Sequence, residues 1–208
     1  MDVRASYDAT ARAYADDLAG ELAGKPLDRH LLDRFAEELR GRGTVADLGC
    51  GPGHIAQYLH ERGVHAIGID LAPAMIDVAR ERFPAVEYRV GDMTALELAD
   101  GALAGAAAFY AIVHAEAPER AAMFRELHRV LAPGGLALIA FHAGSEVIHV
   151  EELYGARVEL DFRFHAPDEI AAQLREAGLP VIERCERAPY PGVEYPSHRC
   201  YLLSRRPA

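Results

Sequence analysis

The sequence has 208 residues, of which 50% are hydrophobic, so it is long enough for one domain with a sizeable core. Its net charge of −10 opposes binding to a phosphate backbone, and we expect no nucleic-acid partner. No apolar run approaches the roughly 20 residues that cross a bilayer, and the N-terminus is too polar for a signal peptide. We therefore expect a cytoplasmic protein with no membrane partner.

The three cysteines, Cys50, Cys185 and Cys200, are too far apart for a CxxC knuckle, and we expect packed, reduced thiols. His142, His149 and His165 fall in one part of the chain but lack the close spacing that is typical of metal ligands. The sequence therefore predicts no metal site.

The first 40 residues have the apolar spacing of two helices, separated by a break at residues 24–26. One side of the first helix carries Tyr7, Ala11, Tyr14 and Leu18. The second helix ends at Gly41 and Gly43, which mark a turn.

From residue 45 onward, short apolar runs alternate with helical patterns, which predicts a parallel sheet covered by helices on both faces. Residues 101–110 fall where a strand is expected although they are rich in alanine, a poor strand former. Residues 145–165 resemble an inserted pair of strands around Gly155. The expected strands are 45–48, 65–70, 86–92, 136–142 and a terminal pair, 181–187 and 200–206; the expected helices are 54–62, 73–83, 118–131 and 167–177.

Three successive strands end in a carboxylate: Asp47, Asp70 and Asp92. Ligands of open parallel sheets bind beyond the carboxyl ends of the strands. Asp70 follows Gly49 by 21 residues, which is the spacing of a carboxylate that accepts both hydrogen bonds from a ribose diol. These positions predict a nucleoside site.

The first strand runs into a turn with glycines at 49, 51 and 53. This G-x-G-x-G spacing differs from the dinucleotide fingerprint, and His54 stands where its third glycine would fall. Asp47, just before the turn, would repel a pyrophosphate and suits a ligand that carries a cation. The pattern disfavours an NAD-dependent oxidoreductase and favours an adenosine-containing, phosphate-free, partly cationic ligand.

The segments VADLGCGPG, IGIDLAPAMIDVAR, VGDM and LHRVLAPGGLALIAF, between residues 45 and 142, resemble the class I S-adenosylmethionine (SAM)-dependent methyltransferases. YDATARAYADDL is similar to the lid helix of members that act on small molecules. The resemblance implies a doubly wound, Rossmann-like α/β fold with seven strands in the order 3-2-1-4-5-7-6, strand 7 antiparallel. We expect a single domain, 1–208, with a helical lid (1–40), a cofactor-binding core (44–142) and inserted strands over the pocket (143–165).

The resemblance also implies which residues bind SAM and its product S-adenosylhomocysteine. The glycine turn would line the methionine and ribose, Asp70 would hold the ribose hydroxyls, and Asp92 would accept from the adenine amino group. The lid tyrosines would close over the cofactor, although such a stripe also suits packing. The expected cofactor-binding residues are Tyr7, Tyr14, Asp47, Gly49, Cys50, Gly51, Gly53, Asp70, Leu71, Met75, Asp92, Met93, Phe109 and Tyr110.

The acceptor is expected to be a small molecule, with O, N, S and C all open as the methylated atom. His114, in the loop after strand four, suits a general base, or lines the pocket without that role. His142 and Arg163 are further candidates for acceptor binding, and Arg163 could instead pair with Asp161. A SAM-binding protein without methyl transfer, either a cyclase or a regulatory binder, is the alternative, and the protein would be a monomer or homodimer.

Overall fold

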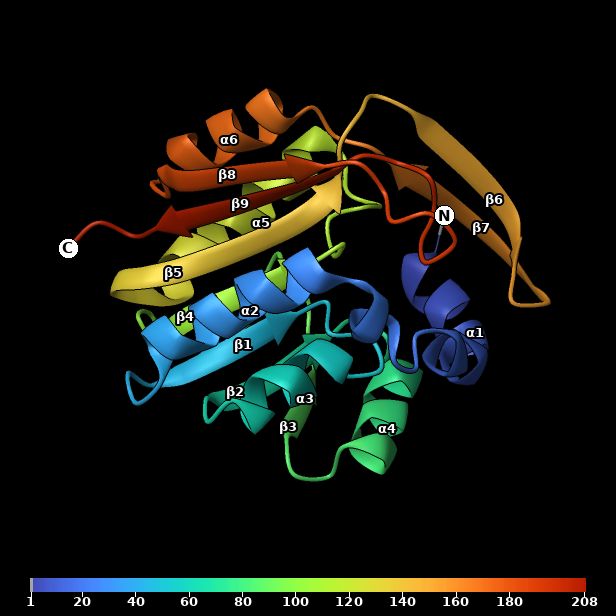
Figure 1. The fold of residues 1–208 in the computed structure, drawn as a ribbon, viewed down its shortest axis with the longest axis horizontal. Helices are drawn as coiled ribbons and strands as arrows, with labels where there is room; N and C mark the ends of the chain where they lie inside the picture. The colour runs from blue at the N-terminus through green and yellow to red at the C-terminus, as the bar shows by residue number, and fades with distance from the viewer. Residues whose placement is uncertain (1) are drawn as a thin grey trace.

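The computed structural model describes residues 2–208 and contains a seven-stranded sheet in the order β3-β2-β1-β4-β5-β9-β8 (Figure 1). Only β9 runs antiparallel to the other strands, since it pairs antiparallel with both β5 and β8. This arrangement confirms the predicted fold class. The strands are β1 (Thr44–Leu48), β2 (His65–Asp70), β3 (Glu87–Val90), β4 (Leu103–Phe109), β5 (Leu131–His142), β8 (Val181–Arg187) and β9 (Arg199–Arg205).

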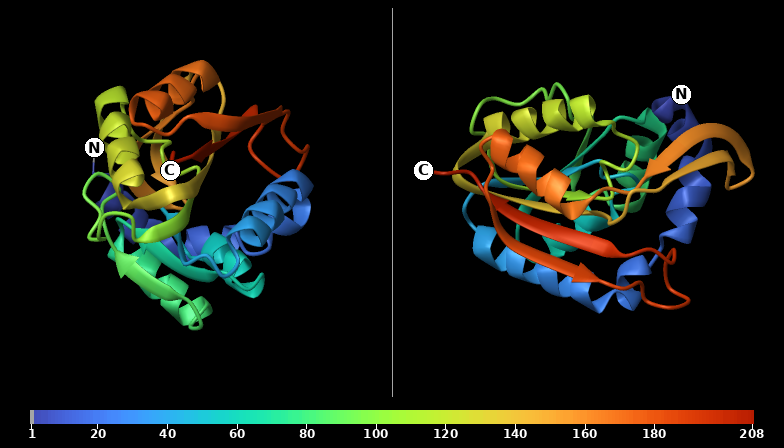
Figure 2. Two further views of the ribbon diagram at one scale, coloured as in Figure 1. Left: turned by 90° about the vertical axis from the view of Figure 1, so that its left-hand side faces the viewer. Right: turned by 90° about the horizontal axis from the view of Figure 1, so that it is seen from above.

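Helices cover both faces of the sheet (Figure 2). One core lies under α2 and α3 and includes Phe35 and Leu59, while the core on the other face lies under α5 and α6 and includes Phe124 and Leu174. The two cores explain why the central strands read as continuous apolar runs. The helices are α1 (Val3–Asp17), the 3-10 turn η1 (Glu21–Gly24), α2 (Pro26–Leu39), α3 (His54–Glu61), α4 (Pro73–Arg82), α5 (Ala117–Val130) and α6 (Pro167–Glu176).

The alanine-rich segment forms the central strand β4, as expected from its place in the pattern. Ala106, Ala107 and Ala108 are buried, because helices pack on both faces of this strand. Small side chains therefore suit β4 for close packing, which outweighs the weak strand propensity of alanine.

The predicted inserted strands form a separate two-stranded sheet, β6 (Val147–Leu153) and β7 (Ala156–Arg163). The hairpin turns at Tyr154 and Gly155, both with positive φ. It extends past the carboxyl edge of the main sheet and lies beside α1 (Figure 1). Tyr154 Oη donates to Asp17 Oδ2 at 2.7 Å, which ties the hairpin to the end of α1.

Two strands differ in extent from the sequence prediction. β3 ends at Val90 because Asp92 forms a turn, in which its Oδ1 accepts from the Thr94 backbone N–H at 2.7 Å. β5 begins at Leu131, before the predicted strand 136–142, and therefore includes the Pro-Gly-Gly segment. The pairing of β4 with β5 shifts register across that segment, so it is a bulge within the strand.

A buried ionic cluster joins α2 to β8 and β9. Asp28 Oδ2 accepts from Arg187 Nη2 at 2.8 Å and from Tyr201 Oη at 2.9 Å, and Asp28 is 1% exposed. Arg187 also pairs with Glu194, in the loop after β8. Removal of one member leaves charges buried with fewer partners, and such losses are costly.

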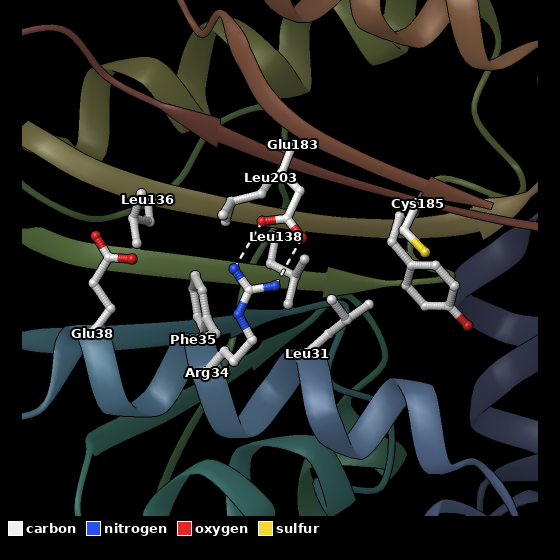
Figure 3. Close-up of a pocket in the computed structure, with 10 residues that line it drawn as sticks. Leu31, Arg34, Phe35, Glu38, Leu136, Leu138, Glu183, Cys185 and Leu203 are labelled. Atoms are coloured by element: carbon white, nitrogen blue, oxygen red, sulfur yellow. Dashed lines mark hydrogen bonds and ion pairs between the residues drawn. The ribbon is translucent and has the colours of Figure 1, made fainter.

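We predict that Asp28→Ala lowers the free energy of unfolding by about 3 kcal/mol, the low end for a broken buried pair because Arg187 keeps Glu194. The control is Arg34→Ala, in the same helix, whose guanidinium meets Glu183 at 2.8 and 2.9 Å on the surface (Figure 3). Because that pair is exposed, its loss should cost less than about 1 kcal/mol. Urea titration measures both variants, and equal losses would contradict the assigned importance of burial.

Candidate functional site

A cleft of about 870 Å³ opens at the carboxyl ends of β1, β2, β4 and β5, under α1 and η1. It is lined by every residue predicted to contact cofactor or acceptor except Gly53 and Arg163. The structure therefore brings the strand-end carboxylates, the lid tyrosines and His114 into one cavity. Their roles in binding remain predictions, whereas their proximity is a property of the fold.

The glycine turn after β1 has two kinds of glycine. Gly51 has φ +49°, and a Cβ there would meet only the Tyr14 ring, at 3.9 Å, so the space beside it is open to the cleft. Gly53 has φ +87°, and a Cβ there would lie 2.6 Å from Tyr88 Oη. Gly51 thus leaves room for a ligand, whereas Gly53 leaves room for packing.

Asp47 holds the helix that follows this turn. Gly53 precedes α3 and has no side chain that could cap it, and Asp47 Oδ2 instead accepts from the Ala56 backbone N–H at 3.0 Å. Burial raises the pKa of Asp47 to about 7. A buried carboxylate with one hydrogen bond has spare capacity for a cationic ligand group.

Asp70 connects the end of β2 to two backbone segments. Its Oδ2 accepts from Gly51 N–H at 2.8 Å, and its Oδ1 accepts from Ala72 N–H at 2.9 Å. Burial raises the pKa of this carboxyl group as well. Each oxygen retains a second lone pair for the hydroxyls of a bound ribose.

Apolar side chains occupy the part of the cleft near Asp92. Leu71 is 40% exposed, whereas Met75, in the first turn of α4, is fully buried. Met93, next to Asp92, also lines the cleft. An exposed leucine that lines the cleft together with a carboxylate and a methionine suits a flat base that is apolar on its faces and polar at its edge.

The lid lies against the cofactor side of the fold. The Tyr7 and Tyr14 rings meet edge to face at 5.7 Å, and Tyr14 meets Tyr154 of the hairpin turn at the same distance. Asp8 Oδ1 accepts from Ala74 N–H at 2.8 Å, which joins α1 to the start of α4. Both tyrosines line the cleft, and Tyr14 lies next to Gly51 of the glycine turn.

Sequence reasoning missed a buried ion pair in this cleft. Lys25 Nζ lies 2.6 Å from Glu21 Oε2, and Glu21 Oε1 lies 2.8 Å from His54 Nε2. Lys25 is the only lysine of the chain and stands at the break between the lid helices, a signal that could have drawn attention to it. Glu194 and Arg199, which also line the cleft, come from the far end of the chain and had no such signal.

His114 bonds through both ring nitrogens. Its Nδ1 lies 2.8 Å from the Asp161 carbonyl oxygen, which can only accept, so Nδ1 carries the hydrogen. Nε2 then holds a lone pair, and Tyr7 Oη donates to it at 2.7 Å. Burial lowers the pKa of His114, which favours the neutral ring.

The other two candidates for acceptor binding lie in different surroundings. His142 lines the cleft at the end of β5, and its Nδ1 is 2.7 Å from Ser197 Oγ. Arg163 is not in the cleft, because its guanidinium pairs with Glu116 at 3.0 Å and with Asp161 at 3.1 Å. For Arg163 the structure shows the internal ion pair that the sequence had left open.

Within residues 2–208, no group of three or more His, Cys, Asp or Glu side chains is arranged to hold a metal ion. Among the same residues, no helix has the length and apolar character needed to cross a bilayer.

Residues 45–135 match the family model of a methyltransferase domain. Malonyl-[acyl-carrier protein] O-methyltransferase of Serratia marcescens is 34% identical over 135 residues, which cover 62% of this chain and 51% of that protein. Ubiquinone biosynthesis O-methyltransferase of Pseudomonas paraeruginosa is 32% identical over 154 residues, covering 66% of this chain and 65% of that one. The chain thus spans between half and two thirds of the length of these relatives.

The fold has a solved counterpart in the Burkholderia thailandensis 1,6-didemethyltoxoflavin-N1-methyltransferase, with a TM-score of 0.72 and 18% identity. The match covers 99% of this chain and 88% of that one. The family model and the curated relatives support a class I SAM-dependent methyltransferase, as the motifs predicted, and the solved neighbour shares its fold. SAM is the cofactor of this family, and the open space at Gly51 and the buried carboxylate of Asp47 fit it.

We predict that Gly51→Ala weakens SAM binding by more than tenfold, because the new methyl group takes up space beside the glycine turn. The matched control is Gly41→Ala, which has φ +75°, nothing within 4 Å of its Cβ and no place in the cleft. Both changes put alanine in the left-handed region and should cost about 1–2 kcal/mol of stability. Calorimetric titration with SAM separates them, and equal affinities would contradict a role for Gly51 in the cofactor site.

We also predict opposite effects of Asp47→Asn on stability and on binding. A raised pKa means that the ionised carboxylate destabilises the fold, and this cost grows from the unfolded pKa up to about pH 7. Without SAM, the variant should melt at a higher temperature than wild type at pH 8, by a margin that shrinks toward pH 4. Its affinity for SAM should fall at least tenfold at pH 8, because asparagine cannot pair with a cation. A variant that melted lower, or bound SAM equally well, would contradict this assignment.

Proposed function

We propose that the protein transfers the methyl group of SAM to an acidic O–H group of a small-molecule acceptor, with His114 as general base. The observation that carries this proposal is the lone pair of His114 Nε2 at the cleft, where it accepts from Tyr7 Oη because Nδ1–H is held by the Asp161 carbonyl. The names of the two curated relatives, both O-methyltransferases, support oxygen as the methylated atom.

When bound, SAM would supply an electrophilic methyl group, which an in-line nucleophile takes while the bond from the methyl carbon to sulfur breaks and S-adenosylhomocysteine leaves. The chain's part is mostly to position the reactants. Asp47, Gly51 and Asp70 hold the methionine and ribose, and Leu71 and Asp92 hold the base. The acceptor hydroxyl takes the place of the Tyr7 hydroxyl at His114 Nε2 and passes its proton to that nitrogen as the new O–CH₃ bond forms.

The lowered pKa keeps His114 in its neutral form, with an unprotonated Nε2, over a wide pH range. Its lowered pKa keeps the ring neutral below the ordinary value of 6.5, so the base is lost only as the pH falls through this lower value. The acid limb of the rate profile therefore belongs below pH 6.5. The His114 ring is therefore neutral at physiological pH.

The test follows formation of S-adenosylhomocysteine over a panel of phenols, hydroxy acids, N-heterocycles and thiols. We expect turnover of at least one O–H acceptor, with kcat/KM constant from pH 8 to 6.5 and falling below it. His114→Gln should lower kcat/KM by about 100-fold, the usual scale for a general base, and should leave SAM affinity unchanged. Tyr7→Phe, which removes the hydroxyl but not the base, is the control and should stay within a few-fold of wild type.

Equal rates for His114→Gln and wild type would exclude His114 as the general base. Binding of SAM without turnover of any acceptor in the panel would favour the cyclase or regulatory alternative.

A further inference from the structure

His142 is a further histidine of the cleft, and its ring is held from several sides. It stacks on Phe164, with centroids 5.0 Å apart and planes 17° apart, and the Tyr110 ring lies 5.0 Å from it. Tyr195 meets it edge to face at 6.3 Å. With Nδ1 bonded to Ser197 at 2.7 Å, the ring has one orientation in the cleft.

The hydrogen-bond chain behind His142 determines which ring nitrogen carries the hydrogen. Arg199 Nη1 donates to Ser197 Oγ, since a guanidinium has no acceptor. Ser197 is buried, and its remaining neighbour in this chain is His142 Nδ1. If Nδ1 carried a hydrogen, the Ser197 hydroxyl hydrogen would have no acceptor, so Ser197 donates and Nδ1 accepts.

His142 Nε2 therefore carries the hydrogen, and it makes no hydrogen bond to any residue in the described range 2–208. The groups that face this ring keep it neutral. Burial, with the positive charges of Arg199 and Lys25, lowers the pKa of His142 to about 3, against the opposing charge of Glu194. A neutral ring with one hydrogen is a permanent donor at Nε2 and is never a base there.

We propose that His142 Nε2–H selects the acceptor molecule by donating to a lone pair on it, typically a carbonyl oxygen, while a hydroxyl of the same molecule meets His114. This inference rests on the proposed function and adds the substrate class: a flat hydroxy-carbonyl compound. The two histidines present opposite groups to the cleft, a lone pair at His114 and an N–H at His142. Aromatic rings that line the cleft beside both, Phe162 at His114 and Tyr110 at His142, suit a planar ring as the body of the acceptor.

A first experiment determines the ring tautomers of His142 and His114 in protein without a methyl acceptor. Nitrogen chemical shifts of 15N-histidine protein, assigned with His142→Phe and His114→Gln, distinguish Nδ1–H from Nε2–H. We expect Nε2–H at His142 and Nδ1–H at His114, both unchanged from pH 8 to pH 6.5. In Ser197→Ala the preference at His142 should be lost, and Ser197→Thr, which keeps a hydroxyl, should retain it. Nδ1–H at His142 in wild type would overturn the proposal even if methyl transfer were established.

A second experiment tests the substrate class with matched probes on protein saturated with S-adenosylhomocysteine. The 3- and 4-hydroxyacetophenones differ from 3- and 4-ethylphenol by one carbonyl oxygen, and affinities come from ligand-observed NMR titration. We expect at least one ketone to bind about fivefold to tenfold more tightly than its ethyl counterpart, the scale of one hydrogen bond. His142→Phe, which keeps a stacked ring, should abolish that difference and leave ethylphenol binding intact. No preference in wild type, or equal losses for both probes, would overturn the inference.

Discussion

The hydrogen bond from Gly51 N–H to Asp70 Oδ2 is the contact on which the cofactor side of the molecule depends. It ties the turn after β1 to the end of β2, while the other oxygen of Asp70 holds Ala72 just before α4. Asp47 does the same for α3 through Ala56 N–H. Asp70 thus fixes the backbone at Gly51, and Asp47 fixes the first turn of α3. Both carboxylates keep lone pairs that a cationic nucleoside can use.

The cofactor side could be predicted from sequence because its residues are close in the chain and obey local rules. A strand end, a glycine turn and a helix start follow one another within 45–56, so spacing alone identifies them. The strand prediction at β4 succeeded for a different reason, since position in the alternating pattern outweighed the poor propensity of alanine. Register was less accessible, and the predicted strand 136–142 left out the bulged first part of β5.

The acceptor side depends on contacts between distant segments, which no local pattern reveals. Arg163 is separated by 47 residues from Glu116, so the sequence could not decide between an ion pair and a substrate contact. Lys25 and Glu194 approach to 3.9 Å from opposite ends of the chain. Such pairs form because burial of a charge is costly without a partner, and the partner is chosen by the fold.

The same separation explains how one fold can keep its methyl donor while it changes its acceptor. The groups proposed to meet SAM come mainly from 45–93, whereas the hydrogen positions of His114 and His142 are set by Asp161 on the hairpin and by Ser197 and Arg199 near the terminus. A histidine presents a lone pair or an N–H according to the partner behind it. The partner of His114 is a backbone carbonyl, so its hydrogen position depends on the course of the hairpin and not on the Asp161 side chain. Substitution of Ser197, in contrast, would change the group that His142 presents to the cleft without disturbing the glycine turn, and selectivity for the acceptor can vary independently of cofactor binding.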